Sequence, residues 1–145
     1  MKQKWHKNWF SNMLPFDIPM VHEGLVYKSV ENFYQAQKCV DMQDKIIISS
    51  LSPFKSKQYA KTVKMVDNWK DLKLQVMETA LRHKFQPGTS WYDKLMETKD
   101  EDIVEFNNWN DIFWGVDIKT NKGKNHLGKL LMGIRNEYLL KNMYE

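Results

Sequence analysis

The chain has only one cysteine, Cys39, among its 145 residues. A single thiol excludes an internal disulfide and any zinc site built from several cysteines. No apolar run approaches the roughly 20 residues that a membrane-spanning helix needs. The basic start, residues 1–9, leads into no apolar segment of the kind that secretory signals carry. We therefore expect a cytoplasmic protein that makes no contact with a membrane.

Several common chemical motifs are also missing. The four histidines, at positions 6, 22, 83 and 126, include no pair four residues apart and no HExxH motif, so we expect no metal site. Neither of the common glycine-rich nucleotide-binding loops occurs, and we expect no bound cofactor. Cys39 has no obvious base beside it, so we expect a buried, inert thiol.

Aromatic residues are plentiful, at 13% of the chain, and they supply both core material and flat surfaces that can stack on a base. Lys and Arg number 22 against 18 Asp and Glu, which gives a net charge of +4. Such a mild excess is typical of many solvated surfaces and is also compatible with a phosphorylated or nucleic-acid ligand. The length and the absence of a linker predict one domain over residues 1–145, with basic residues 1–8 as a candidate flexible start.

The apolar pattern predicts an α+β domain that is predominantly helical with a few short strands. Strands are expected at residues 24–27, after a turn, and at residues 103–106. Ser29 is a candidate N-cap for a helix whose apolar side includes Val40. Further helices are expected at residues 44–64 (two, broken at Ser52-Pro53), 67–86, 90–98 and 125–144, with residues 107–124 mostly loop.

Glu31, Gln35 and Lys38 share one border of the apolar side of the first helix. At about 100° per residue they fall within an arc of roughly 60°. A carboxylate, an amide and an ammonium thus converge, although such a pair is also typical of a solvated face. On a later helix, Lys73 and Lys84 lie together beside the apolar stripe. Lysines there either cover apolar surface or, in a partly desolvated pocket, bind phosphate or act as nucleophiles.

Residues 107–115 combine amides, one carboxylate and two indoles. Loops of this kind often line binding sites, although Trp109 and Trp114 can equally anchor the loop to the core. The last helix begins near Asn125 after a Gly-Lys pair, and free N–H groups at this start suit an anion. Arg135 lies at the border of the helix's apolar face, where it either reaches the same site or pairs with a carboxylate.

A series of short motifs runs along the chain from Phe10 to Arg135. They are Phe10-Ser11-Asn12; Ser29-Val30-Glu31; Tyr34-Gln35-Ala36-Gln37-Lys38; Trp69, Lys73 and Met77; Leu81, Lys84 and Phe85; Thr98; Val104-Glu105; Asp111; Phe113-Trp114-Gly115; Gly123-Lys124-Asn125; Leu127-Gly128; Leu130-Leu131-Met132; and Arg135. In this order they resemble the NADAR family of YbiA-like N-glycosidases. The resemblance implies an enzyme that hydrolyses the bond between ribose C1′ and a nitrogen atom.

The resemblance implies a catalytic Glu31, with Lys38, Lys73 and Asp111 as further candidate catalytic residues. The candidate substrate-binding residues are Ser11, Asn12, Gln35, Lys84, Trp114, Gly115, Asn125 and Arg135. A carboxylate can stabilise an oxocarbenium-like state, activate water or protonate the leaving base, whereas a lysine can attack C1′ and form a Schiff base. Both routes stay open. The role of Asp117 stays open too, because an intervening valine separates it from the Trp-Gly pair where relatives often have an acidic residue.

Two substrate classes follow from the resemblance: ADP-ribose attached to guanine in nucleic acid, and the phosphoribosylamino-pyrimidine intermediates of riboflavin biosynthesis. A non-catalytic module that binds ADP-ribose or a nucleotide is the alternative. A nonspecific nucleic-acid-binding protein, whose affinity falls steeply with salt, is a third class. The pairing of Glu31 with Lys38 argues against a pure binding module, which has no need of it. The sequence leaves the oligomeric state open.

Overall fold

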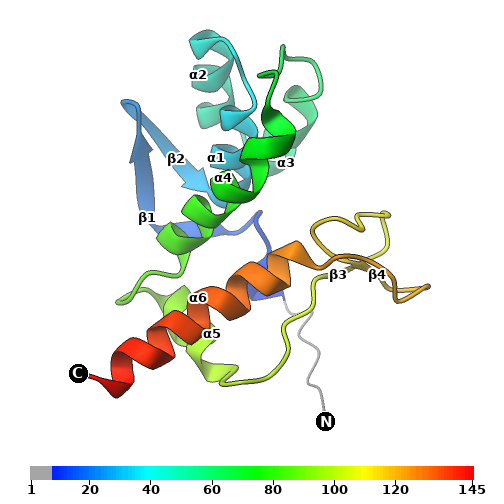
Figure 1. Cartoon of the computed structure of the whole chain (residues 1–145). Coiled ribbons are helices and arrows are strands. Elements are labelled where there is room, and N and C mark those ends of the chain that lie inside the picture. The colour runs from blue at the N-terminus through cyan, green and yellow to red at the C-terminus, as the bar shows by residue number, and fades with distance from the viewer. Residues whose placement is uncertain (1–7) are drawn as a thin grey trace. The chain divides into compact units, whose positions relative to one another are not determined.

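The computed structural model describes residues 8–145, which divide into two compact units (Figure 1). The N-terminal unit is Trp9–Trp91, and the C-terminal unit comprises Tyr92–Glu145 together with Asn8. The described residues form six α-helices and two two-stranded sheets, which confirms the predicted helix-rich α+β class. The single domain over residues 1–145 stays a prediction. Apart from Asn8, the predicted flexible start lies outside the described residues.

A β-hairpin opens the N-terminal unit, after a short 3-10 helix, η1 (Asn8–Phe10). Strand β1 (Pro15–His22) pairs antiparallel with β2 (Leu25–Ser29). Glu23 and Gly24 both have positive φ angles, and they form the tight turn that the sequence predicted ahead of the strand at residues 24–27. The side chains that the hairpin buries are Phe16, Met20, Tyr27 and Ser29.

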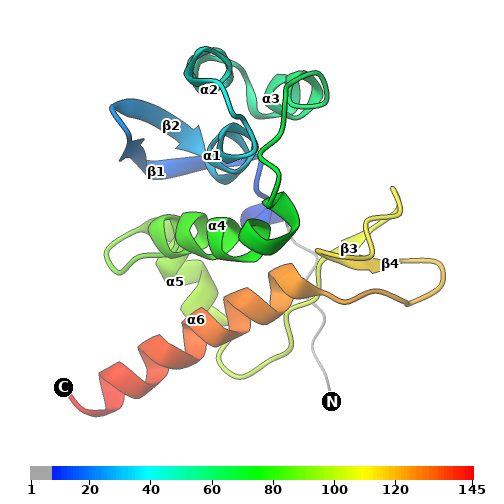
Figure 2. The ribbon, with the colours of Figure 1, turned by 45° about the horizontal axis from the view of Figure 1, so that its top comes forward.

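Four helices complete this unit: α1 (Val30–Gln37), α2 (Met42–Ser50), α3 (Pro53–Tyr59) and α4 (Trp69–Lys84). Ser29 caps α1 as predicted, because its Oγ accepts the N–H of Asn32 at 3.1 Å. Ser52 caps α3 in the same way and Pro53 occupies its first turn, so the predicted helix break is confirmed. Figure 2 shows α1 beside the hairpin and beside α2 and α3, all of which it contacts.

The buried side chain of Asn32 links α1 to α2 and α3 through hydrogen bonds. Its Nδ2 donates to the carbonyl oxygens of Ile48 and Leu51 and to Ser56 Oγ, at 3.0, 2.9 and 2.7 Å. Its Oδ1 accepts the hydroxyl of Ser29 at 2.6 Å. A buried amide left without partners costs about 1–3 kcal/mol, so this set of bonds favours one placement of α1 against α2 and α3.

The first helix ends earlier than the sequence predicted. Val40 lies beyond α1 and is 46% exposed, so it is not part of the helix's buried side. Cys39 forms an antiparallel bridge with Met65, and the N–H of Val40 donates to the carbonyl of Lys64 at 3.1 Å. These backbone groups are used by extended pairing, which ends the helical ladder.

The C-terminal unit contains most of α5 (Ser90–Glu97), a small parallel sheet and α6 (His126–Met143). The sheet joins β3 (Phe106–Asn107) to β4 (Val116–Asp117). On α6 the apolar pattern predicted an inward side of Leu127, Leu130, Leu131, Ile134 and Tyr138. The side chains of Leu127, Leu131 and Ile134 are buried, whereas Leu130 and Tyr138 are only half-buried. None of the helices within residues 8–145 has the length and hydropathy of a membrane span.

The strand predicted at residues 103–106 is wrong in position. The carbonyl of Ile103 accepts Asn125 Nδ2 at 2.9 Å, and the N–H of Glu105 donates to Asn125 Oδ1 at 3.0 Å. A side chain thus takes one carbonyl and one N–H of this segment, which keeps a single β-bridge at Ile103 and a bond from the N–H of Val116 to the carbonyl of Glu105 at 2.7 Å. Only Phe106, the last residue of the predicted strand, and the following Asn107 join the sheet.

Candidate functional site

The buried carboxylate of Glu31 is the centre of the candidate site in the N-terminal unit. It lies in the first turn of α1 and is 8% exposed. Its Oε2 accepts a hydrogen bond from Gln35 Nε2, one turn along the helix, at 2.5 Å. Its backbone N–H donates to the carbonyl of Asn12 at 3.0 Å. The two side chains converge as their spacing predicts, but in a buried position and not on a solvated face.

Lys38 brings positive charge to the same side of α1. Its Nζ lies 5.4 Å from the ring centroid of Tyr34 and 5.9 Å from that of Trp69. Burial lowers the pKa of Lys38 below its usual value. The charge of Glu31 opposes this shift, whereas nearby lysines, Lys73 among them, add to it. The amine of Lys38 is therefore easier to deprotonate than a solvated lysine.

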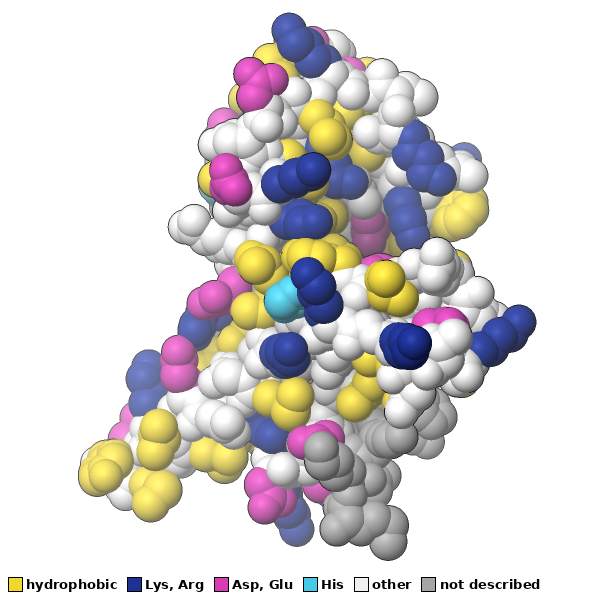
Figure 3. All heavy atoms as spheres, turned by 45° about the vertical axis from the view of Figure 1, so that its right-hand side comes forward, with side chains coloured by type: hydrophobic (Ala, Val, Ile, Leu, Met, Phe, Trp, Pro, Cys, Tyr) yellow, Lys and Arg dark blue, Asp and Glu magenta, His cyan; other side chains and the backbone are white. Residues whose placement is uncertain are grey.

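Lys73 reaches this neighbourhood from α4, which packs against α1. It is half-buried, in contrast to the exposed Lys70 one turn earlier. In Figure 3, Lys and Arg side chains gather on one face of the N-terminal unit. A positive surface of this kind suits a phosphorylated ligand.

Two amide oxygens on residues that contact Glu31 are buried without a hydrogen-bond partner: Gln35 Oε1 and Asn12 Oδ1. Gln35 is 4% exposed, and its other amide atom already binds the carboxylate. Asn12 Nδ2 lies 3.7 Å from the sulfur of Met77. Proteins pair nearly all of their buried polar atoms, so open acceptors beside a buried carboxylate indicate a binding function.

Lys84 and Ser11 hold the chain segment that leads to Asn12. Lys84 is 1% exposed, and its Nζ donates to the carbonyls of Trp9 and Ser11 at 3.1 and 2.9 Å. Ser11 Oγ accepts the N–H of Met13 at 3.3 Å. These bonds fix the backbone beside Glu31. The substrate contacts expected of Lys84 and Ser11 stay predictions.

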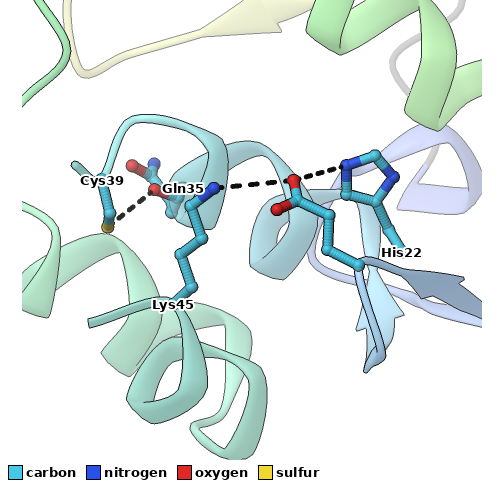
Figure 4. A network of polar contacts seen from close by, with 5 residues as sticks. His22, Gln35, Cys39 and Lys45 are labelled. Carbon is cyan, nitrogen blue, oxygen red and sulfur yellow. Dashed lines mark hydrogen bonds and ion pairs between the residues drawn. The ribbon is translucent and has the colours of Figure 1, made fainter. Parts of the chain in front are cut away.

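Cys39 is buried as predicted, and its Sγ lies 3.7 Å from the carbonyl oxygen of Gln35 (Figure 4). Burial raises the pKa of this thiol to about 11, so it is protonated and unreactive at neutral pH. A separate cluster in the same figure joins His22 and Lys45 to the carboxylate of Glu23, at 3.1 and 3.7 Å. That cluster belongs to the hairpin turn and α2.

Two neighbours of Lys38 were not among the sequence candidates, namely Tyr34 and Trp69. Their rings pack edge to face, with centroids 5.1 Å apart. Tyr34 precedes Lys38 by one helical turn, a spacing that brings a ring and an ammonium together on a helix. Trp69 comes from α4, so only tertiary packing reveals its contact.

In the C-terminal unit, Asp111 shapes the loop that carries Trp114. Its Oδ1 accepts the N–H groups of Phe113 and Trp114 at 3.2 and 3.0 Å. The two rings pack edge to face with centroids 4.8 Å apart. A Cβ at Gly115 would collide with the carbonyl oxygen of Glu105, so this position requires glycine. The catalytic role of Asp111 and the stacking role of Trp114 stay predictions.

The start of α6 offers fewer free N–H groups than the sequence predicted. The N–H groups of His126 and Leu127 donate to the carbonyls of Phe113 and Trp114, at 3.2 and 3.0 Å. The preceding residue, Asn125, adopts a left-handed conformation with φ of 53° and uses its side chain within the unit. These two N–H groups are therefore not available to an anion, and the anion site and the substrate contact expected of Asn125 stay predictions.

Arg135 is buried on α6 and binds neutral oxygens. Its Nη1 donates to Thr98 Oγ1 at 2.9 Å and to the carbonyl of Glu101 at 2.7 Å, while its Nε is buried without a partner. Asp117, whose role the sequence left open, caps a turn. It accepts the hydroxyl of Thr120 at 3.0 Å and the N–H of Lys119 at 3.3 Å, and these bonds hold the pKa of Asp117 below its usual value. The substrate contact expected of Arg135 stays a prediction.

Within residues 8–145, no group of three or more His, Cys, Asp or Glu side chains is placed to hold a metal ion. The chemistry available to the described residues is that of a buried carboxylate, a lysine with a lowered pKa and uncharged amide groups. This combination is typical of sites that polarise or attack a carbon centre carrying developing positive charge.

Comparison with known proteins identifies the family of this chain. The model of the NADAR domain matches residues 1–139, and the chain belongs to this family. An N-glycosidase of Nostoc punctiforme (strain ATCC 29133 / PCC 73102) is 36% identical over 135 residues, which span 88% of this chain and 83% of that protein. A riboflavin biosynthesis protein of Vibrio vulnificus (strain YJ016) is 31% identical over 134 residues, which span 89% of this chain and 35% of that protein.

The N-glycosidase YbiA of Escherichia coli (strain K12) is similar in both sequence and structure. It is 33% identical over 137 residues, which span 88% of this chain and 79% of that protein. The NMR structure of E. coli YbiA matches with a TM-score of 0.84 and 28% identity, over 100% of this chain and 90% of that chain. The helix-rich fold is therefore shared with a solved member of the family.

Proposed function

We propose that this protein is a hydrolase that cleaves the N-glycosidic bond between C1′ of a phosphorylated ribose and a nitrogen atom of a base. The observation that carries the proposal is the buried Glu31 carboxylate, held by Gln35 and close enough to Lys38 to influence its pKa. Relatives that bear the name N-glycosidase and match most of this chain support the same class of reaction.

Glu31 acts on the charge that develops at the sugar. As the C1′–N bond breaks, its electron pair leaves with the nitrogen, and positive charge spreads over C1′ and the ring oxygen. A buried carboxylate stabilises that charge more strongly than water does. The leaving nitrogen gains a proton, and water adds a hydroxyl to C1′. The products are the free base and the free sugar phosphate.

Lys38 supplies a second route to the same products. Its neutral amine attacks C1′ as the bond to the base breaks, and opening of the sugar ring then gives a Schiff base to the lysine. Water hydrolyses this intermediate and returns the free amine. The lowered pKa of Lys38 supports this route because only the neutral amine is a nucleophile. Lys73 is the second candidate, and Glu31 stabilises positive charge in both routes.

We infer a phosphoribosylamino-pyrimidine as the first candidate substrate, because a relative with a riboflavin biosynthesis name matches across most of this chain. ADP-ribose attached to guanine is the second candidate. The Lys and Arg side chains on one face of the N-terminal unit favour it, since a nucleic-acid backbone is drawn to positive surface. Both substrates present the same ribose C1′–N bond.

A mass-spectrometric cleavage assay tests the proposal. Purified protein is incubated with a phosphoribosylamino-pyrimidine and, separately, with a guanine-ADP-ribosylated oligonucleotide. We expect release of ribose 5-phosphate from the first substrate or of ADP-ribose from the second. Glu31→Gln should lower turnover by about 10²–10⁴-fold, the usual contribution of a positioned carboxylate.

Asp71→Asn on the exposed side of α4 is the matched control, and it should keep full turnover. Full activity in Glu31→Gln would remove that residue from the mechanism. Binding without any product from wild-type protein would favour the non-catalytic module. Affinity that falls steeply with salt and ignores Glu31 would favour a nonspecific nucleic-acid-binding protein.

A further inference from the structure

Two residues that contact Glu31 each carry an open hydrogen-bond acceptor. Gln35 Oε1 and Asn12 Oδ1 are both buried and have no hydrogen-bond partner among the described residues. The donor ends of both amides are already placed, since Gln35 Nε2 binds the Glu31 carboxylate and Asn12 Nδ2 points at Met77. A ligand that satisfies this site must therefore bring hydrogen-bond donors of its own.

The position of Gln35 indicates which donor it meets. Its Oε1 belongs to the same amide group as the Nε2 that binds Glu31, so the open oxygen lies one amide width from the nitrogen that holds the carboxylate. If Glu31 faces C1′, the nearest polar atoms of the sugar are the ring oxygen and the 2′-hydroxyl. The ring oxygen has no proton to give, whereas the 2′-hydroxyl is a donor.

Asn12 approaches Glu31 from a different segment of the chain. Its carbonyl accepts the N–H of Glu31 at 3.0 Å, which fixes Asn12 at the N-terminal end of α1, while Gln35 lies one turn later. The two open oxygens thus belong to different backbone segments that both contact Glu31. Two neighbouring hydroxyls on one sugar ring match such a pair of acceptors.

We propose that Gln35 and Asn12 read the 2′,3′-diol of the ribose whose C1′ reacts, with Gln35 accepting the 2′-hydroxyl and Asn12 the 3′-hydroxyl. The site then takes ribosides and rejects deoxyribosides. This inference rests on the proposed function, because it names the sugar that the same site accepts. The physical basis is that a deoxy sugar leaves a buried acceptor oxygen without a hydrogen bond. A site whose acceptors are placed for a hydroxyl therefore binds the sugar that lacks this hydroxyl much more weakly.

Binding to wild-type protein is the cleanest test, since removal of the 2′-hydroxyl also makes an N-glycosidic bond more labile in water. The probe is a 5′-phosphorylated C-riboside of a pyrimidine, whose C1′–C bond does not hydrolyse. Titration calorimetry compares it with its 2′-deoxy and 3′-deoxy analogues. We expect each deoxy analogue to bind about 10- to 100-fold more weakly, the cost of one unpaired buried acceptor.

Variants assign each hydroxyl to its acceptor. Gln35→Met should bind the ribo and 2′-deoxy probes equally well while still preferring the ribo probe over the 3′-deoxy one. Asn12→Leu should show the opposite pattern. Gln75→Met, on the exposed side of α4, is the matched control and should keep both preferences. General damage to the fold weakens all three probes together, so a selective loss identifies the contact.

Deoxy analogues that bind wild-type protein within twofold of the ribo probe would overturn the inference, and would mean that water satisfies the two oxygens. If either variant fails to fold, the wild-type comparison still decides. The cleavage assay is independent of this result. Cleavage without a preference for the diol would support the proposed function and overturn this inference. A preference for the diol without cleavage would support this inference and contradict the proposed function.

Discussion

The candidate site in the N-terminal unit and the C-terminal unit use buried amides in different ways. In the C-terminal unit, Asn125 closes hydrogen bonds to the backbone of Ile103 and Glu105, and Asn107 does the same toward Asp111. In the N-terminal unit, the amide of Gln35 holds a carboxylate and leaves its oxygen open. Burial of a polar side chain is therefore no sign of chemistry by itself. What separates the two cases is whether the group's hydrogen bonds are completed by the protein.

Asn125→Ala gives the largest effect expected from this comparison. It leaves the buried carbonyl of Ile103 and the partly buried N–H of Glu105 unpaired and places alanine in a left-handed conformation. We expect the free energy of unfolding to fall by about 2–4 kcal/mol. Urea denaturation measures it. Asn121→Ala is the matched control, because Asn121 is also left-handed, with φ of 59°, but is exposed. Equal losses in the two variants would mean that backbone conformation, and not the bridge, is responsible.

Trp114→Ala tests whether the C-terminal unit nevertheless contributes to binding. An indole that stacks on a base or ribose contributes about 1–3 kcal/mol, so we expect substrate affinity to weaken by that amount. Steady-state kinetics on the cleaved substrate would show it as a raised KM. Trp109→Ala is the control, since Trp109 is 61% exposed. Unchanged KM and kcat in Trp114→Ala would remove this residue from the site.

The smallest expected effect is a displacement of the pH profile by Lys38. Burial lowers the pKa of Lys38, so a reaction that needs its neutral amine should speed up as pH rises, with a midpoint below that of a solvated lysine. The unfolded chain binds more protons in that interval, so stability should also rise there. Borohydride should then trap a covalent adduct that Lys38→Met abolishes. A rate that falls as pH rises through this interval would assign Lys38 the role of a cation.

The sequence predicts those features that depend on neighbours along the chain. The caps at Ser29 and Ser52 follow from local preferences, and the convergence of Glu31 with Gln35 follows from helical spacing. Contacts between distant segments were beyond such reasoning. The bridge made by Asn125 displaced a predicted strand, for example. Likewise, the resemblance to a family marked Asn125 as a candidate substrate-binding residue. It did not reveal that the side-chain amide of Asn125 hydrogen-bonds to the backbone.

The ammonium of Lys84 has a consequence for the order in which the chain acquires its site. Its bond to the carbonyl of Ser11 joins residues 73 positions apart, so it closes a long loop at an entropic cost. The segment that carries Asn12 can be clamped only after α4 has formed and docked. During synthesis on the ribosome, the residues of the hairpin and of the first helices emerge well before Lys84. The ability to bind a ligand is therefore gained later than the secondary structure. In a nascent chain that stops before the end of α4, Glu31 is present but Lys84 does not yet hold the segment that carries Asn12.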